Sequence, residues 1–219
     1  GREQIAAIIN CEPAELYFTS GGTESDNIAV LGTAYHYRGK KNHLVVGATE
    51  HHAVLETAEH LMHKDGFKLD LLPVNDDGFS SPDDLRRLVN DQTALVSVMH
   101  ANNETGAVQD IASLTEVTRE KSVLFHTDAV QSTGKIKVDV KQLGVDLLSL
   151  TGHKIYGPKG VGLLYIRKNT LLKRIQDGGE QEFGLRAGTA RRHRPPVRLP
   201  TLLPRQAASL RVRRPSGVA

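Results

Sequence analysis

Tryptophan is missing from this 219-residue sequence, which has one cysteine, two methionines and only 5% aromatic residues. A single cysteine, Cys11, excludes a disulfide within the chain and a metal cluster held by several cysteines. No apolar run is long enough to cross a bilayer, and the opening residues 1–4 have no signal-peptide character. We therefore expect a cytoplasmic protein, and because the first residue is not methionine we expect a fragment of a longer chain.

Acidic residues are missing from the end of the chain. Residues 190–219 contain eight arginines and five of the nine prolines, but no lysine and no acid. The net charge of +3 is therefore made of +8 in this tail and −5 in residues 1–189. A basic tail can bind nucleic acid, but this one has neither a helical or strand period nor interleaved aromatics. We expect a disordered tail, or the product of a shifted reading frame, rather than a nucleic-acid arm.

Strand and helix patterns alternate through the first 166 residues, in a chain whose 39% hydrophobic content is ordinary for a globular protein. The predicted strands are 16–18, 43–47, 68–73, 94–100, 123–126, 145–150 and 161–166. The predicted helices are 2–10, 54–63, 83–89 and 111–120, together with one that starts at the glycine turn 21–23 and continues through Ala34. Alternation with strongly apolar strands predicts an α/β fold, with a mostly parallel sheet flanked by helices.

Polar clusters follow the predicted strands, where ligands bind in parallel sheets. The clusters are 21–23, 49–52, 100–104, 128–131 and 151–154. The last one places Lys154 beside a hydroxyl and an imidazole, just after an apolar run and within a glycine-rich segment. A lone lysine is usually solvated. These neighbours instead favour an anion-binding site with amine chemistry.

Three kinds of ligand could bind where these polar clusters meet. Scattered histidines and aspartates could bind a metal, but no spacing matches a zinc motif. A dinucleotide is disfavoured because no G-x-G-x-x-G opens a helix. The glycine turn at 21–23 suits a phosphate at a helix start, although such turns often only cap helices. Pyridoxal phosphate accounts for the lysine, for Asp128 and for the phosphate turn together.

Six motifs, in one order between residues 2 and 189, resemble those of the cysteine desulfurases, members of the class V aminotransferase group. They are Thr-Ser-Gly-Gly-Thr-Glu-Ser-Asp-Asn (19–27), Thr-Glu-His (49–51), Met-His-Ala-Asn-Asn-Glu-Thr-Gly (99–106), His-Thr-Asp-Ala-Val-Gln-Ser (126–132), Gly-His-Lys-Ile-Tyr-Gly-Pro-Lys-Gly (152–160) and Gly-Leu-Arg-Ala-Gly-Thr (184–189). The resemblance implies the large domain of the aspartate-aminotransferase-like (fold type I) enzymes over residues 1–189. The N-terminal arm and the C-terminal small domain of that family are then missing.

The resemblance also assigns roles to single residues. Lys154 would bind pyridoxal 5'-phosphate as a Schiff base and move the substrate's α-proton, and His51 would stack on the ring. Asp128 would keep the ring nitrogen protonated. The other implied contacts are Asn103 and Gln131 near the ring oxygen and substrate, Gly22, Thr23, Thr151 and His153 at the phosphate, and Thr189 at the phosphate of the other subunit.

The implied reaction converts L-cysteine to L-alanine and passes the sulfur to a persulfide, for iron–sulfur cluster assembly. The implied assembly is a homodimer that serves a sulfur-acceptor or scaffold protein. The family's catalytic cysteine should come well after the lysine, and this chain has none there, so we expect little turnover. The alternatives are a selenocysteine lyase, another class V transferase, or a fragment that binds the cofactor without catalysis. We expect no metal and no membrane partner.

Overall fold

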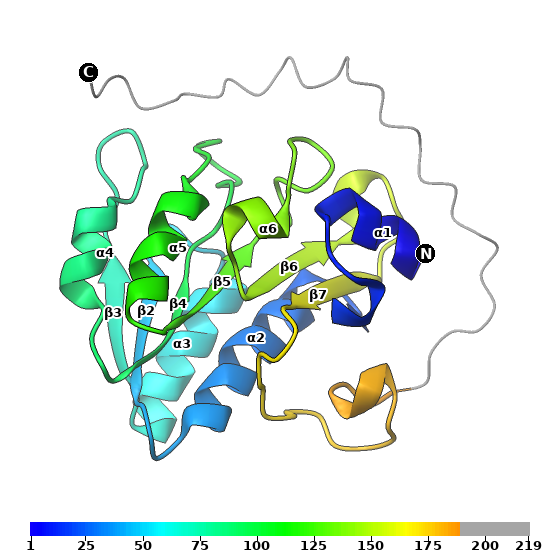
Figure 1. Cartoon of the computed structure of the whole chain (residues 1–219), viewed down its shortest axis with the longest axis horizontal. Helices are drawn as coiled ribbons and strands as arrows, with labels where there is room; N and C mark the ends of the chain where they lie inside the picture. Colours follow the sequence, from blue (N-terminus) through cyan, green and yellow to red (C-terminus); the bar gives the residue numbers. More distant parts are fainter. Residues whose placement is uncertain (189–219) are drawn as a thin grey trace.

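Seven strands form one sheet in the computed structural model, which describes residues 1–188 (Figure 1). Their order across the sheet is β1-β7-β6-β5-β4-β2-β3. The strands are β1 (Leu16–Thr19), β2 (His43–Gly47), β3 (Lys68–Leu72), β4 (Thr93–Ser97), β5 (Leu124–Asp128), β6 (Leu147–Thr151) and β7 (Gly162–Ile166). Strand β7 runs antiparallel to both of its neighbours, β1 and β6, and the other neighbouring pairs in this sheet are parallel. The mostly parallel sheet that the sequence predicts is confirmed.

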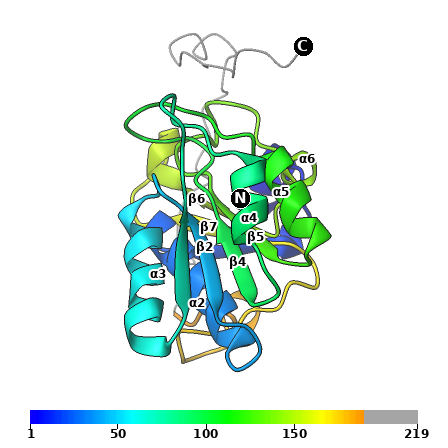
Figure 2. The same cartoon turned by 90° about the vertical axis from the view of Figure 1, so that its left-hand side faces the viewer.

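Helices cover both faces of the sheet (Figures 1 and 2). The α-helices are α1 (Arg2–Ile9), α2 (Gly22–Tyr37), α3 (His52–Asp65), α4 (Pro82–Leu88), α5 (Ile111–Glu120) and α6 (Val140–Leu143). Three short 3-10 helices are η1 (Pro13–Glu15), η2 (Gly152–Ile155) and η3 (Glu182–Gly184). Helices α2 and α3 pack in one apolar cluster, and α1, α4, α5 and α6 pack in the other. The fold therefore has three layers.

Strand β2 shows how the two clusters share the sheet. Leu44 and Val46 point toward α2 and α3, whereas Val45 between them packs with the cluster of α4 and α5. All three are fully or almost fully buried. A parallel strand covered on both faces is apolar at every position, which is why these strands read as continuous hydrophobic runs.

Local signals explain most of the element boundaries. Ser81 caps α4 by accepting a hydrogen bond from the N–H of Asp83, with proline at the first helical position. The predicted strand 94–100 is too long, since β4 ends at Ser97. Past that point the chain still bonds to β5, with the N–H of His100 donating to the carbonyl of Asp128. Helix α6 and the 3-10 helices lie outside the predicted elements.

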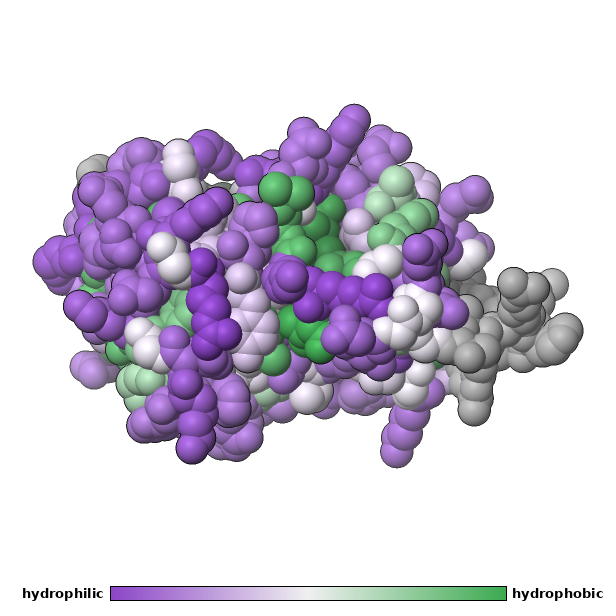
Figure 3. Space-filling view, turned by 90° about the horizontal axis from the view of Figure 1, so that it is seen from below, coloured by the Kyte–Doolittle hydropathy of each residue, from purple (hydrophilic) through white to green (hydrophobic). Residues whose placement is uncertain are grey.

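The surface is mainly hydrophilic, and Figure 3 shows apolar side chains gathered near the middle of one face. The large apolar residues that are exposed within residues 1–188 are Ile8, Leu71, Tyr156, Leu171 and Phe183. None of the helices in this range combines the length and the hydropathy that spanning a bilayer requires. The predicted basic tail, 190–219, lies outside the described residues.

Candidate active site

A cavity of about 160 Å³ opens where the parallel strands end. It is lined by Gly22, Thr23, Asp26, His51, Met99, Asn103, Asp128, Val130, Gln131, Thr151, His153 and Lys154. Asp128 and Thr151 are the last residues of β5 and β6, and the others come from the segments that follow β1, β2, β4, β5 and β6. Nine of the ten predicted site residues line it, and the tenth, Thr189, lies outside the described residues. The five predicted polar clusters thus contribute to one pocket.

The N-terminus of α2 packs closely against the segment that follows β5. A Cβ atom added at Gly22 would lie 2.8 Å from Cγ2 of Val130, so only glycine allows this approach. The first N–H groups of a helix have no acceptor within it, and they carry the positive end of the helix dipole. With the exposed hydroxyl of Thr23, they form a place where an anion can bind.

Thr151 and His153 extend this anion-binding end. The Thr151 hydroxyl donates to the carbonyl of Val161 at 3.1 Å, and its oxygen lies 3.1 Å from Nδ1 of His153. Lys154 follows in the 3-10 helix η2, with its side chain exposed at the pocket. Within residues 1–188 its amine makes no hydrogen bond or ion pair. The lysine is therefore free to react with a ligand.

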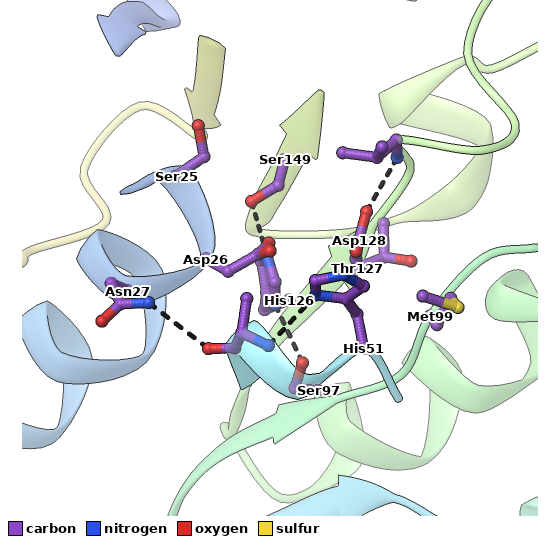
Figure 4. A network of polar contacts seen from close by, with 12 residues as sticks. Ser25, Asp26, Asn27, His51, Ser97, Met99, His126, Thr127, Asp128 and Ser149 are labelled. Atoms are coloured by element: carbon purple, nitrogen blue, oxygen red, sulfur yellow. Dashed lines mark hydrogen bonds and ion pairs between the residues drawn. The ribbon is translucent and has the colours of Figure 1, made fainter. Parts of the chain in front are cut away.

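Asp128 lies at the inner end of the pocket and is only 3% exposed. Its Oδ1 accepts a hydrogen bond from the N–H of Val130 at 2.8 Å, which Figure 4 draws. Burial raises the pKa of Asp128, while this N–H and the nearby His51 and Lys154 act to lower it. A buried carboxylate in this position can hold a cationic ring nitrogen.

His51 is the N-cap residue of α3, so its ring is not free to move over the pocket. Its Nδ1 accepts a hydrogen bond from the N–H of Ala53 at 3.1 Å, which fixes the orientation of the ring (Figure 4). The neighbouring His52 points to solvent and lies 3.7 Å from Glu56, as expected for a surface residue.

The sequence analysis missed four residues of the site. Asp26, Met99 and Val130 line the cavity, and Glu50 lies buried beside it. A signal for Asp26 did exist, because it shares a helical face with Ala29 and Thr33, and all three are buried. A carboxylate on an apolar helix face indicates a buried polar site.

A larger cavity of about 470 Å³ adjoins the first and shares Asn103 and Gln131 with it. Its outer wall includes Lys135, whose amine donates to Oε1 of Gln131 at 2.9 Å. Burial and then the charge of Lys154 lower the pKa of Lys135. The two lysines therefore make the border between the cavities electropositive.

One comparison identifies the family. The family model described as Aminotransferase class-V matches residues 1–196. The chain belongs to the class V aminotransferases.

Known relatives support this membership, and several of them are cysteine desulfurases. The chain is 48% identical over 188 residues to the cysteine desulfurase IscS of Clostridium botulinum, covering 86% of this chain and 47% of that protein. Among solved structures, a NifS-like protein superposes with a TM-score of 0.83 at 41% identity, covering 86% of this chain and 52% of the other. The structure titled SspA in complex with cysteine gives the same score and identity, covering 86% and 55%. The chain spans about half the length of these relatives.

The resemblance to cysteine desulfurases and the fold of the type I pyridoxal-phosphate enzymes are thus confirmed. Pyridoxal 5'-phosphate is the cofactor of this family. It has an aldehyde, a ring nitrogen and a phosphate. The pocket offers a free amine at Lys154, a buried carboxylate at Asp128 and an anion-binding helix start at Gly22. The residues present therefore fit the group.

Proposed function

We propose that this chain is the cofactor-binding part of a pyridoxal-phosphate-dependent cysteine desulfurase. The reaction breaks the carbon–sulfur bond of L-cysteine, transfers the sulfur to a thiol as a persulfide, and leaves L-alanine. One observation carries the proposal: Lys154, Asp128 and the α2 start face a single pocket. The names of the relatives, which are cysteine desulfurases or proteins related to them, support this substrate over others.

The residues of the pocket have distinct roles in this proposal. Lys154 attaches the cofactor and then holds or moves the proton at the α-carbon of the substrate. The bound cofactor supplies an electron sink for the α-carbon. Asp128 keeps the ring nitrogen protonated, His51 lies beside the ring, and Asn103 and Gln131 orient the substrate at the border of the two cavities. The phosphate is held by Gly22, Thr23, Thr151 and His153, with Thr189 reaching the phosphate of a partner subunit.

Cys11 does not serve as the sulfur-carrying thiol. It lies before β1, at the opposite end of that strand from the pocket, and is half-buried. Burial, followed by the charges of Glu15 and Glu12, raises its pKa to about 12. A thiolate is the reactive form, so this thiol is inert at neutral pH. We propose that the 219-residue chain binds the cofactor over residues 1–189 but releases little sulfide by itself.

The remaining assignments follow from the same proposal. We place the protein in the cytoplasm as a homodimer that delivers sulfur to an acceptor or iron–sulfur scaffold protein. A fragment that binds the cofactor without catalysis is the second candidate, and the properties of Cys11 favour it for the chain in isolation.

Titration of the 219-residue chain with pyridoxal phosphate tests the proposal. We expect a visible absorption band that is missing in Lys154→Ala and retained in Lys135→Ala. Lys135 lines only the larger cavity of about 470 Å³ and not the candidate cofactor pocket. Reduction with borohydride followed by peptide mapping should place the cofactor on Lys154. A band that survives in Lys154→Ala, or a label on Lys135, would contradict the assignment. A folded chain without any band would contradict cofactor binding altogether.

A further inference from the structure

Three buried carboxyl groups lie together beneath the candidate cofactor pocket. Asp26 comes from the first turns of α2, Glu50 follows β2, and Asp128 ends β5. They are 1%, 8% and 3% exposed. The charge of Asp128 raises the pKa of Asp26, and the charges of Asp128 and Asp26 raise that of Glu50, so the three groups share one electrostatic site. Three adjacent buried carboxyls cannot all be ionised, because like charges in a low-dielectric site repel strongly.

Burial raises the pKa of Asp128 too, but of the three carboxyls Asp128 has the most groups that support its charged form. The N–H of Val130 donates to it at 2.8 Å, and the cationic Lys154 lies at the same pocket. Both lower the pKa of Asp128 against the effect of burial. Neither of the other two carboxyls has a cation in its surroundings that lowers its pKa.

The surroundings of Asp26 favour its neutral form. Its Oδ1 has no hydrogen-bond partner within residues 1–188. Nε2 of His126 lies 3.6 Å away, but burial lowers the pKa of His126 to about 3, so the imidazole carries no charge. That ring is held by Ser97 at 2.8 Å and Ser149 at 3.0 Å, one on each nitrogen, as Figure 4 shows.

Glu50 resembles Asp26 more than Asp128. Its Oε1 accepts a hydrogen bond from the N–H of Met99, whereas Oε2 has no partner in the described part of the chain. Burial and then the charges of Asp128 and Asp26 raise the pKa of Glu50 well above its usual range. Burial and then the charge of Asp128 do the same for Asp26, against a hydrogen bond from Ser149.

We propose that Asp26 is a positioning residue that stays uncharged beside Asp128, so that the one negative charge of this cluster resides on Asp128, where the ring nitrogen of the cofactor binds. Glu50 is the second uncharged acid. This inference rests on the proposed cofactor site. The groups that face Asp26 are His126 and Asp128 from β5, Ser149 from β6 and Glu50 from the segment after β2. None of these four supplies a positive charge, and Lys154 and His51, which line the same cavity, lower the pKa of Asp128 but not that of Asp26.

Infrared spectroscopy of the cofactor-free chain tests the protonation directly. Protonated carboxyl groups absorb apart from carboxylates, and we expect such bands at neutral pH. Asp26→Asn should remove one of them, Glu50→Gln another, and Asp128→Asn neither. If Asp26→Asn does not fold, Asp26→Ser takes its place. If the wild-type chain shows no protonated-carboxyl band at neutral pH, or if only Asp128→Asn removes it, the proposal is wrong.

The affinity for the cofactor gives a second measurement. It would not distinguish Asp26 from Asp128 if both residues were only structural. At neutral pH we expect Asp26→Asn to bind pyridoxal phosphate within about twofold of wild type, and Asp128→Asn to bind at least about tenfold more weakly, because it alone removes a buried charge that has a partner. The reverse order would overturn the proposal. If the wild-type chain binds no cofactor while the Asp26 band is present, the cofactor site is wrong and the protonation of Asp26 stands.

Discussion

A methyl group at Gly22 tests how tightly the pocket is built. In Gly22→Ala the new Cβ would lie 2.8 Å from Cγ2 of Val130, whereas ordinary contacts are 3.4–4 Å. Val130 must therefore move by at least about 0.6 Å to restore ordinary van der Waals contact. Its β-branched side chain has one preferred rotamer and cannot simply turn away. Because its N–H donates to Asp128, the movement also disturbs that carboxylate.

The expected loss of stability is about 1–2 kcal/mol. Overpacking a well-packed site costs about 1–3 kcal/mol. The higher helix propensity of alanine returns up to about 1 kcal/mol at this first helical position. Cofactor affinity should fall as well, since Gly22 and Asp128 lie in the same pocket.

Urea unfolding measures the stability, and titration with pyridoxal phosphate measures the affinity. Gly21→Ala is the matched control, because its Cβ would have no atom within 4 Å and its backbone is extended. We expect it to stay within about 0.5 kcal/mol of wild type. Combining Gly22→Ala with Val130→Ala should recover about 1 kcal/mol relative to the sum of the single effects. Equal stability of the two glycine variants, or strict additivity with Val130→Ala, would refute the close-contact explanation.

Two further predictions concern ionisable side chains. Burial alone would raise the pKa of Glu24, but hydrogen bonds from Arg186 at 2.7 Å and from the N–H of Ser20 outweigh it and lower this pKa. The resulting stability, about 1–3 kcal/mol, is present above the unfolded pKa of about 4.3 and lost as pH falls through the native value. Urea unfolding of Glu24→Gln should therefore show a deficit at pH 7 that shrinks at about pH 3; a deficit that does not change with pH would contradict the pairing. For Cys11, whose pKa is raised to about 12, a thiol reagent should react at least about a hundredfold more slowly with the native chain than with the unfolded one. Rapid labelling of the native chain would show that Cys11 is reactive after all.

The fold was predictable where one strand or helix carries a strong period and clear ends. Strand β2 and helix α5 have the predicted bounds, since each is a short apolar or amphipathic run between turn residues. Helix α6 was not predicted, because a run of four residues is too short to show a helical period. Its cap, Asp139, accepts hydrogen bonds from the N–H groups of Lys141 and Gln142, and an aspartate at that place could have indicated it.

The direction of β7 was also readable in principle. Only the short 3-10 helix η2 separates it from β6, and the connecting residues 152–161 are too few for a parallel crossover, so an antiparallel neighbour is the expected result. The predicted site residues within residues 1–188 line one pocket, because they lie at or just after the ends of strands. Asp26 and Glu50 were not predicted: the helical face that Asp26 shares with Ala29 and Thr33 was the one local signal for Asp26, and the burial of Glu50 depends on tertiary packing.

The place of β7 also has a consequence for the order of folding. β1 is among the first elements of the chain, yet its partner in the sheet is β7, with Leu16 opposite Tyr165. Closing a loop of that length costs entropy before any contact compensates for it, and strand pairs distant in sequence form late. A chain emerging from the ribosome would hold the glycine turn after β1 long before Lys154 could approach it. The pocket should therefore be among the last parts of the described chain to assemble, and a nascent chain that stops before Ile166 should have no binding site.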